Sequence, residues 1–376
     1  MDRRRFLQLG LTSAVLPLAR GRAGPGGGVA AFVGTYTEGT GSAGVYRLRR
    51  TDVRRRPLTE GGGVAVGPNP SFLALHPRLP VLYAVNEVDA GSVAAFRYAP
   101  GDGDLTLLGR RPTGGGAPCY ASVDRDGRSL LVANYLGGSV ARFPLGADGT
   151  PGEAALDQHR GSGPRADRQE RAHAHSIVPD PSGRWAVSAD LGADRLYVYA
   201  LGDRGGAFAP AAEVAARPGA GPRHLVFDRA GRFVYVVNEL DLTATVYRFD
   251  PRAGALAPVQ TVALVEEAGA GGERTAADVH LAPSGRFLYA SVRGDDVIAV
   301  FAVDPATGGL TFVERVPTGG HWPRNFAISP EGATLLVANQ RSNAVVGFDV
   351  DARTGRLTRN ALRFEVPAPV CVRFVG

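Results

Sequence analysis

Short apolar runs separated by turn residues recur along the chain with a period of about fifty residues. Seven of these runs end in similar tripeptides, and the steps between their ends are 52, 48, 56, 48, 54 and 47 residues. The runs end at Gly34, Asn86, Asn134, Asp190, Asn238, Val292 and Asn339. A repeat of this length indicates a propeller or a solenoid.

Each repeat is predicted to contain four short strands. In the unit that follows Gly221, the predicted strands are 224–227, 233–238, 243–249 and 256–262. Asp, Gly and Pro residues lie between these runs and favour turns. Four strands per repeat are typical of one propeller blade. Amphipathic helical periodicity is missing after the N-terminal segment, which argues against an α-solenoid.

The two ends of the chain are predicted to share one blade. The first unit begins near Val29 at its second strand and lacks the innermost strand that opens the other six. The segment 369–374, Pro-Val-Cys-Val-Arg-Phe, has the form of 222–227, Pro-Arg-His-Leu-Val-Phe. Pairing of the two ends would close the ring and leave no open sheet edge. We therefore expect an all-β, seven-bladed β-propeller with four-stranded blades.

The first 23 residues are predicted to be an export signal. Residues 3–7 read Arg-Arg-Arg-Phe-Leu, a modest apolar stretch covers 9–18, and Gly-Arg-Ala at 21–23 offers a cleavage site. This order of features is that of a twin-arginine signal. We expect export by the twin-arginine (Tat) machinery to the periplasm or the cell exterior. A single propeller domain is expected over residues 24–376.

Net charge gives no indication of a nucleic-acid partner. The formal charge of the whole chain is +6, but residues 1–23 hold five Arg and one Asp, which leaves about +2 for the rest. So low a net charge does not indicate the basic surface that nucleic acids require, and no nucleic-acid partner is expected. After the signal, no apolar run approaches the roughly 20 residues of a membrane span.

The chain has two cysteines, Cys119 and Cys371. The repeat places both on inner strands, in blades that are two apart, so a disulfide between them is not expected. We interpret both as buried small side chains rather than as nucleophiles.

The repeat also locates a candidate site at one mouth of the ring. Consecutive strands of a blade are antiparallel, so the start of the first strand and the end of the second lie on the same face. The starts of the first strands carry Ser71, Cys119, His175, Arg223, Ala277, Arg324 and Val370. The residues at the ends of the second strands are Thr35, Glu87, Tyr135, Leu191, Glu239, Arg293 and Gln340. The Arg, His and Glu residues among them depart from their sibling positions and are therefore candidates for function.

Other interpretations of these residues stay open. Any single charged residue at a strand end can be part of a solvated rim. The pairs His173 with His175 and Asp278 with His280 have a spacing that could bind a metal, but the neighbouring arginines favour an anionic ligand, so no metal or cofactor is expected. The Asn that recurs at the ends of the second strands is interpreted as scaffold.

Two long connections, 160–171 and 266–274, enter inner strands and are expected to overhang this mouth. Such segments can form a lid over a binding site or remain plain surface loops.

Several short motifs, in this order and spacing, resemble the seven-bladed lactonase family that includes bacterial propeller-type 6-phosphogluconolactonases and the fungal carboxy-cis,cis-muconate cyclase. The motifs are Val-Gly-Thr-Tyr-Thr at 33–37, Asn-Pro-Ser-Phe-Leu at 69–73, Ala-His-Ala-His-Ser at 172–176, Gly-Pro-Arg-His at 221–224, Val-Asn-Glu at 237–239 and Pro-Arg-Asn-Phe at 323–326. The resemblance covers nearly the whole chain after the signal. It implies a catalytic group of four residues, which are His175, Arg223, Glu239 and Arg293. Five further residues at or beside the same mouth are expected to bind substrate, namely His173, Arg324, Glu87, Tyr135 and His224.

The resemblance therefore implies a small-molecule lactone as substrate, hydrolysed by water. We expect Glu239 or His175 to act as general base, while Arg223 and Arg293 bind the substrate's anionic group and stabilise the oxyanion. Two adjacent arginines should keep the pKa of Glu239 low, so His175 is the better base at neutral pH. The sequence leaves open whether the lactone is phosphorylated. It also leaves open a ring-forming cyclase of the muconate type and a propeller that only binds a ligand or protein.

Overall fold

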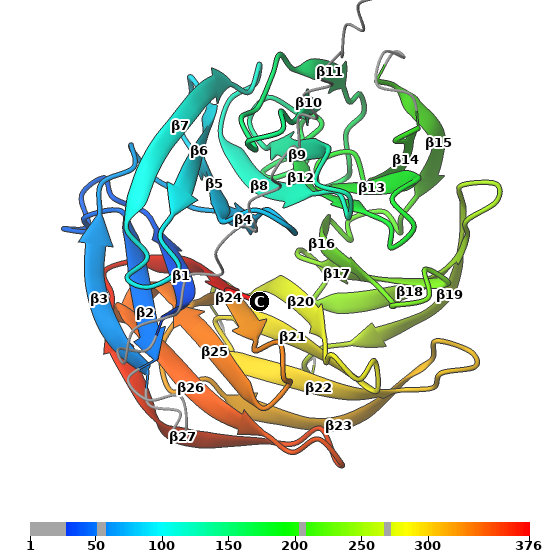
Figure 1. Ribbon diagram of the computed structural model, residues 1–376. Helices are drawn as coiled ribbons and strands as arrows, with labels where there is room; N and C mark the ends of the chain where they lie inside the picture. The colour runs from blue at the N-terminus through cyan, green and yellow to red at the C-terminus, as the bar shows by residue number, and fades with distance from the viewer. Residues whose placement is uncertain (1–27, 51–57, 203–207, 267–271) are drawn as a thin grey trace, which may run out of the picture.

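The computed structural model describes residues 28–50, 58–202, 208–266 and 272–376. These residues form seven four-stranded antiparallel sheets arranged as blades around a common centre (Figure 1). The predicted all-β, seven-bladed propeller is therefore confirmed. The one helical element in the described part is a 3-10 turn, η1 (Gln340–Ser342), and no helix there has the length and apolarity to cross a membrane. The predicted signal at 1–23 lies outside the described residues.

Each blade runs outward from the centre in four strands (Figure 1). Blade 1 contains β28 (Pro369–Phe374), β1 (Val29–Thr35), β2 (Val45–Arg50) and β3 (Leu58–Val64). Blade 2 contains β4 (Leu73–Leu75), β5 (Val81–Asn86), β6 (Ser92–Tyr98) and β7 (Leu105–Pro112). Blade 3 contains β8 (Pro118–Val123), β9 (Ser129–Asn134), β10 (Ser139–Pro144) and β11 (Ala155–Gln158). Blade 4 contains β12 (Ala174–Pro179), β13 (Trp185–Asp190), β14 (Arg195–Ala200) and β15 (Pro210–Ala215).

The last three blades follow the same order. Blade 5 contains β16 (Pro222–Phe227), β17 (Phe233–Asn238), β18 (Thr243–Asp250) and β19 (Ala255–Ala263). Blade 6 contains β20 (Thr275–Leu281), β21 (Phe287–Arg293), β22 (Val297–Val303) and β23 (Leu310–Pro317). Blade 7 contains β24 (Pro323–Ile328), β25 (Thr334–Asn339), β26 (Ala344–Val350) and β27 (Leu357–Glu365).

Both ends of the described chain meet in blade 1, as the repeat predicts. β1 pairs antiparallel with β28, with Val33 opposite Val372 and Gly34 opposite Cys371. The last strand of the chain therefore supplies the innermost strand of the first blade and closes the ring.

The core lies between blades rather than at one centre. The second strands β5, β9, β17 and β25 are buried at every position, because neighbouring sheets cover both of their faces. For example, Val187 and Val198 of blade 4 pack in one cluster with Val234 and Tyr247 of blade 5. The outermost strand β15 instead alternates between half-buried and exposed positions, as expected for a strand with one solvated face.

A β-bulge interrupts the first strand of several blades close to the predicted site. In blade 4 the register with the second strand shifts between Ala174 and Ser176, which leaves His175 as the extra residue. The same shift occurs in blades 3, 5 and 7, where the extra residues are Cys119, Arg223 and Arg324. A bulge takes one residue out of the hydrogen-bonded ladder and re-aims its side chain. The candidate positions are therefore set by a repeated irregularity of the backbone.

The recurring Asn residues tie strand ends together. The side-chain amides of Asn86, Asn134 and Asn339 donate to the carbonyl oxygens of Pro68, Thr113 and Thr318, at 2.7, 3.2 and 3.3 Å. Each of these carbonyls lies on the segment that enters the first strand of the same blade. The repeated position therefore serves the scaffold, in keeping with the sequence interpretation.

Cys119 and Cys371 are both buried and neither forms a disulfide. They lie on β8 and β28, the inner strands of blades 3 and 1. The predicted separation by two blades is confirmed.

Candidate active site

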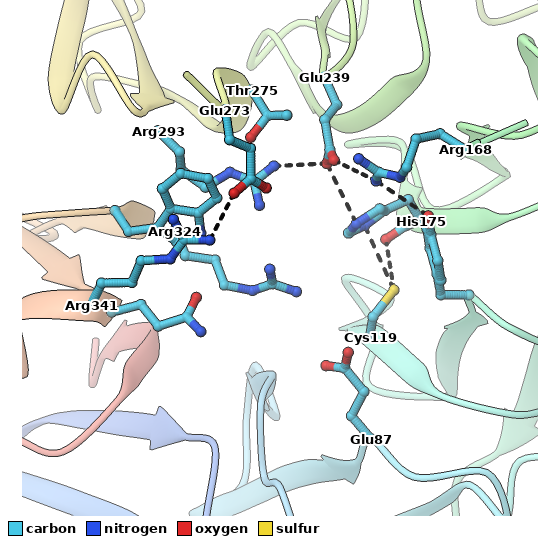
Figure 2. Close-up of a pocket in the computed structure, with 13 residues that line it drawn as sticks. Glu87, Cys119, Arg168, His175, Glu239, Glu273, Thr275, Arg293, Arg324 and Arg341 are labelled. Atoms are coloured by element: carbon cyan, nitrogen blue, oxygen red, sulfur yellow. Dashed lines mark hydrogen bonds and ion pairs between the residues drawn. The ribbon is translucent and has the colours of Figure 1, made fainter. Parts of the chain in front are cut away.

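A cavity of about 470 Å³ opens at the mouth where first strands begin and second strands end (Figure 2). Six of the predicted site residues line it, namely Glu87, Tyr135, His175, Glu239, Arg293 and Arg324. They come from blades 2 to 7, so the cavity is formed by the convergence of blades rather than by any single one.

Glu239 is the most highly connected residue of the cavity. It follows β17, and its backbone N–H donates to the carbonyl of Gly221 at 2.8 Å, which fixes the end of the strand. Its Oε2 accepts from Nε of Arg223 at 2.7 Å and lies 2.9 Å from Nη2 of Arg293. Its Oε1 accepts from Nη2 of Arg168 at 2.7 Å. Figure 2 shows Arg168 and Arg293 reaching this carboxylate from opposite sides.

The Glu239 carboxylate is ionised although its side chain is only 3% exposed. Burial by itself raises the pKa of the carboxyl. The positive charges of the neighbouring groups, first Arg293 and Arg223, lower the pKa by more than burial raises it, so the pKa lies well below its ordinary value. A buried charge is tolerated when it is paired and hydrogen-bonded. Glu239 is therefore a structural anion and a weak base.

His175 lies at the bulge of β12 and faces the same carboxylate. Its Nε2 is 4.0 Å from Oε2 of Glu239, and its Nδ1 is 3.6 Å from Sγ of Cys119. The ring makes edge contacts with Tyr135 and His224, with centroids 5.3 Å apart in both cases. Burial, and then the charge of Arg223, hold the pKa of His175 well below its ordinary value. The imidazole is therefore neutral at physiological pH.

Two arginines provide positive charge on the other side of the cavity. Arg293 donates from Nη2 to the carbonyl of Ala276 at 3.0 Å, and its guanidinium lies 5.4 Å from the ring centroid of Trp322. Burial lowers the pKa of Arg293 to about 9, which still leaves it protonated at neutral pH. Arg324 lies over the ring of Tyr36 at 5.3 Å and forms no hydrogen bond with any described residue. Figure 2 shows its guanidinium extending into the cavity.

Glu87 faces the cavity from the end of blade 2's second strand. Both of its carboxylate oxygens accept from the hydroxyl of Tyr36, at 2.9 and 3.0 Å. Tyr36 thus connects Glu87 to Arg324 through a hydrogen bond on one side and ring stacking on the other.

Three of the predicted site residues do not line the cavity. Arg223 is 1% exposed and lies beneath Glu239, where it also donates to the carbonyl of Ala277. The ring of His173 stacks on the ring of Tyr135, with centroids 4.5 Å apart, and so helps to hold Tyr135 in position. His224 bonds to Oδ1 of Asp278 at 2.7 Å, and burial lowers its pKa to about 3. Each of the three contacts a residue that lines the cavity: Arg223 contacts Glu239, His173 contacts Tyr135, and His224 contacts His175.

Several cavity residues were not identified from the sequence. Arg168 lies on the 160–171 connection, which was expected to overhang this mouth, and Glu273 lies on the other long connection. Glu273 pairs with Nη2 of Arg341 at 2.9 Å, and Arg341 stacks on Trp322 at 3.3 Å. The sequence could have indicated Arg168 and Glu273 only through their position in connections that were expected to overhang this mouth. Trp322 precedes Pro323, and the residues before the corresponding Pro in three other blades, Asn69, Ala117 and Ala368, also have positive φ. The repeat therefore marks the backbone position of Trp322 but not its side chain.

Within the described ranges, no three His, Cys, Asp or Glu side chains are grouped so that they would hold a metal ion. The spaced pair Asp278 and His280 is internally bonded, with Nε2 of His280 3.0 Å from Oδ2 of Asp278.

Comparisons with known proteins agree with this architecture. The family described as "Lactonase, 7-bladed beta-propeller" matches residues 30–374. A protein of Bacillus subtilis named 6-phosphogluconolactonase is 37% identical over 349 residues, which cover 92% of this chain and 97% of that protein. One of the same name from Formosa agariphila is 33% identical over 343 residues, covering 87% of this chain and 94% of its own. The solved structure of a periplasmic gluconolactonase from Pseudomonas aeruginosa superposes with a TM-score of 0.85 at 36% identity, covering 93% of this chain and 99% of that one. The chain therefore belongs to the seven-bladed β-propeller lactonase family.

Proposed function

We propose that this protein is a lactonase, a carboxylic ester hydrolase that opens the lactone of a sugar acid. The observation that carries the proposal is the neutral imidazole of His175, 4.0 Å from a carboxylate that is held by arginines, at the wall of an open cavity. This arrangement offers a base for water beside positive charge for a developing oxyanion. The names of the relatives support the same reaction.

In the proposed mechanism His175 is the general base. Its Nε2 has no hydrogen-bond partner among the described residues, so with the ring proton on Nδ1 beside Cys119 it can accept a proton from water. The resulting hydroxide attacks the lactone carbonyl carbon. The ring C–O bond then breaks, and the imidazolium returns the proton to the leaving oxygen. Glu239 is the weaker candidate for the base, because three guanidinium groups already occupy its oxygens.

Three arginines are proposed to have three different tasks. Arg293 lines the cavity and lies beside Glu239, so it is suited to stabilise the oxyanion of the tetrahedral intermediate. Arg324 forms no hydrogen bond with the described residues and is suited to bind a carboxylate or phosphate of the substrate. Arg223 acts on catalysis through Glu239, whose position it holds.

The test is a pH-indicator assay of the purified protein on glucono-δ-lactone and 6-phosphogluconolactone, with and without chelator. His175→Ala should lower kcat by about a hundredfold or more and leave KM within a few-fold, since general-base catalysis contributes that much. Glu239→Gln should also lose activity, because the arginines around it would no longer be held. Unchanged turnover in His175→Ala would remove His175 from the mechanism. No hydrolysis of either lactone by the unaltered protein would favour the cyclase or the ligand-binding propeller.

A further inference from the structure

Arg168 differs from the other two arginines on Glu239 in its place in the fold. Arg223 and Arg293 lie on strands β16 and β21, and their side chains are 2% and 5% exposed. Arg168 lies on the connection between blades 3 and 4, and its side chain is 32% exposed. It is therefore the partner of Glu239 that can turn towards a ligand without disturbing the packing of a blade.

The connection nevertheless holds Arg168 in a defined position. Gln169 is fully buried, donates from Nε2 to the carbonyl of Leu191 at 2.8 Å, and accepts the backbone N–H of Arg165 at 3.1 Å. Glu170 lies 3.1 Å from Nε2 of His173, which itself stacks on Tyr135. The backbone on both sides of Arg168 is thus anchored at the cavity wall, and its guanidinium is held there by Glu239 and by the hydroxyl of Tyr135, which lies 3.3 Å from Nη2.

The two oxygens of Glu239 are not equivalent. Oε2 is shared by Arg223 and Arg293, whereas Arg168 is the one hydrogen-bond partner of Oε1 among the described residues. If Arg168 leaves, two guanidinium groups still compensate the buried carboxylate. Oε1 then becomes a free acceptor facing the cavity.

We infer that Arg168 exchanges its partner Glu239 for the carboxylate that forms when the lactone opens. This inference rests on the proposed lactonase function. Hydrolysis adds the hydroxyl of water to the carbonyl carbon, breaks the ring C–O bond, and yields a carboxylate, a hydroxyl group and one released proton. A guanidinium binds the new carboxylate through two parallel N–H donors. The vacated Oε1 of Glu239 accepts a hydrogen bond from the hydroxyl released by the ring.

Calorimetric titration with gluconate tests the exchange without requiring turnover. Arg168→Gln should bind gluconate about tenfold more weakly or worse, because a charge-assisted pair with the carboxylate is lost. Arg165→Gln is the matched control, since Arg165 is on the same connection, its side chain is 49% exposed, and that side chain pairs with no described residue other than Asp167. The control should match the unaltered protein within about twofold. Equal affinity in Arg168→Gln and the unaltered protein overturns the inference, and so does the absence of gluconate binding to the unaltered protein.

A second readout separates carboxylate binding from support of the fold. Arg168 is one of the charges that lower the pKa of Glu239, so Arg168→Gln should raise that pKa. Protonation of Glu239 would then release the arginines that it holds, in addition to the protonation of the base His175, and the acid limb of kcat/KM should move to higher pH. Arg168→Lys keeps the charge but loses the paired donors, so it should leave the limb in place and still weaken gluconate binding. An Arg168→Gln variant with lower activity and an unmoved limb assigns Arg168 a structural role and overturns the inference. Failure of the unaltered protein to hydrolyse lactones would instead count against the proposed function, whereas the gluconate titration would still decide the exchange.

Discussion

At the scale of single residues, the site is organised around one buried carboxylate. Glu239 is 3% exposed and contacts three guanidinium groups, so its negative charge balances part of a cluster that would otherwise repel itself. Burial raises its pKa, yet Arg293 and Arg223 lower it well below the ordinary value. The same pairing that makes Glu239 a poor base makes it important for the stability of the cavity.

Glu239→Gln should therefore destabilise the protein by about 3–5 kcal/mol, because breaking a buried ion pair leaves uncompensated charge. The measurement is urea unfolding at neutral pH. Glu273→Gln is the control, since Glu273 and its partner Arg341 are 59% and 43% exposed and such a surface pair contributes at most about 1 kcal/mol.

The pH dependence of this difference follows from the direction of the pKa shift. Because the pKa of Glu239 is depressed in the folded state, its contribution is complete above the ordinary value of 4.5 and is lost as the pH falls through the folded pKa. The gap in unfolding free energy between the unaltered protein and Glu239→Gln should thus be constant from pH 8 to about 5 and shrink only at lower pH. A gap that already shrinks between pH 7 and 6 would point to another titrating group.

The repeat was sufficient to predict part of this site and not the rest. His175, Glu239 and Arg293 were placed at one mouth because antiparallel strands bring the start of one and the end of the next together. Arg168 was not predicted because it lies on a connection between blades rather than at a repeated strand end. The stacking of Arg341 on Trp322 depends on side-chain geometry that no periodic pattern encodes.

At the scale of elements, glycines in the outer hairpins of blades 5, 6 and 7 allow each of these blades to pack closely against the one before it. A Cβ added at Gly254, Gly308 or Gly355 would come within 2.6, 2.5 or 2.3 Å of a ring atom of Trp185, Phe233 or Phe287, respectively. Each of these rings begins the second strand of the preceding blade. The hairpins also need a left-handed backbone at these glycines, with φ of 64°, 73° and 74°. Glycine is required there for both conformation and space.

Two glycine variants separate the two requirements. Gly285→Ala should cost about 1–2 kcal/mol, since its φ is 71° but nothing lies within 4 Å of the added Cβ. Gly355→Ala should cost at least about twice as much, because the new methyl group also displaces the buried ring of Phe287. Urea unfolding gives both values. Neither glycine lines the cavity, so lactone turnover should stay unchanged in both variants. Equal destabilisation by the two substitutions would show that the contact of Gly355 with the ring of Phe287 does not contribute to stability.

The boundaries of the strands were largely predictable, unlike their irregularities. The predicted strands 233–238, 243–249 and 256–262 agree with β17, β18 and β19 to within one residue at each end. The alternation of apolar and polar residues and the turn residues between strands are local features, so they can be recognised in a single sequence. The bulges at His175 and its siblings, and the glycine contacts between blades, depend on how neighbouring sheets pack and so were not foreseen.

At the scale of the whole molecule, the ring closes late. β28 is the last strand of the chain, and its pairing with β1 completes blade 1. The closure was predictable because one unit lacked its first strand and the far end of the chain supplied a segment of matching form. Blade 1 can therefore be completed only after β28 has been synthesised.

Completion of the ring by β28 is compatible with the predicted twin-arginine export, because this route carries folded proteins. The prediction can be tested at residues 1–23. Replacing Arg3 and Arg4 with Lys should leave the protein folded and active in the cytoplasm of a bacterial host that has this machinery. The charge is unchanged, so only recognition of the arginine pair is lost. Replacing Arg20 and Arg22 with Lys makes the same chemical change outside the pair and should leave export intact. Cell fractionation with a lactone assay of each fraction gives the answer. Equal export of both double variants would show that the arginine pair is not what directs this protein out of the cytoplasm.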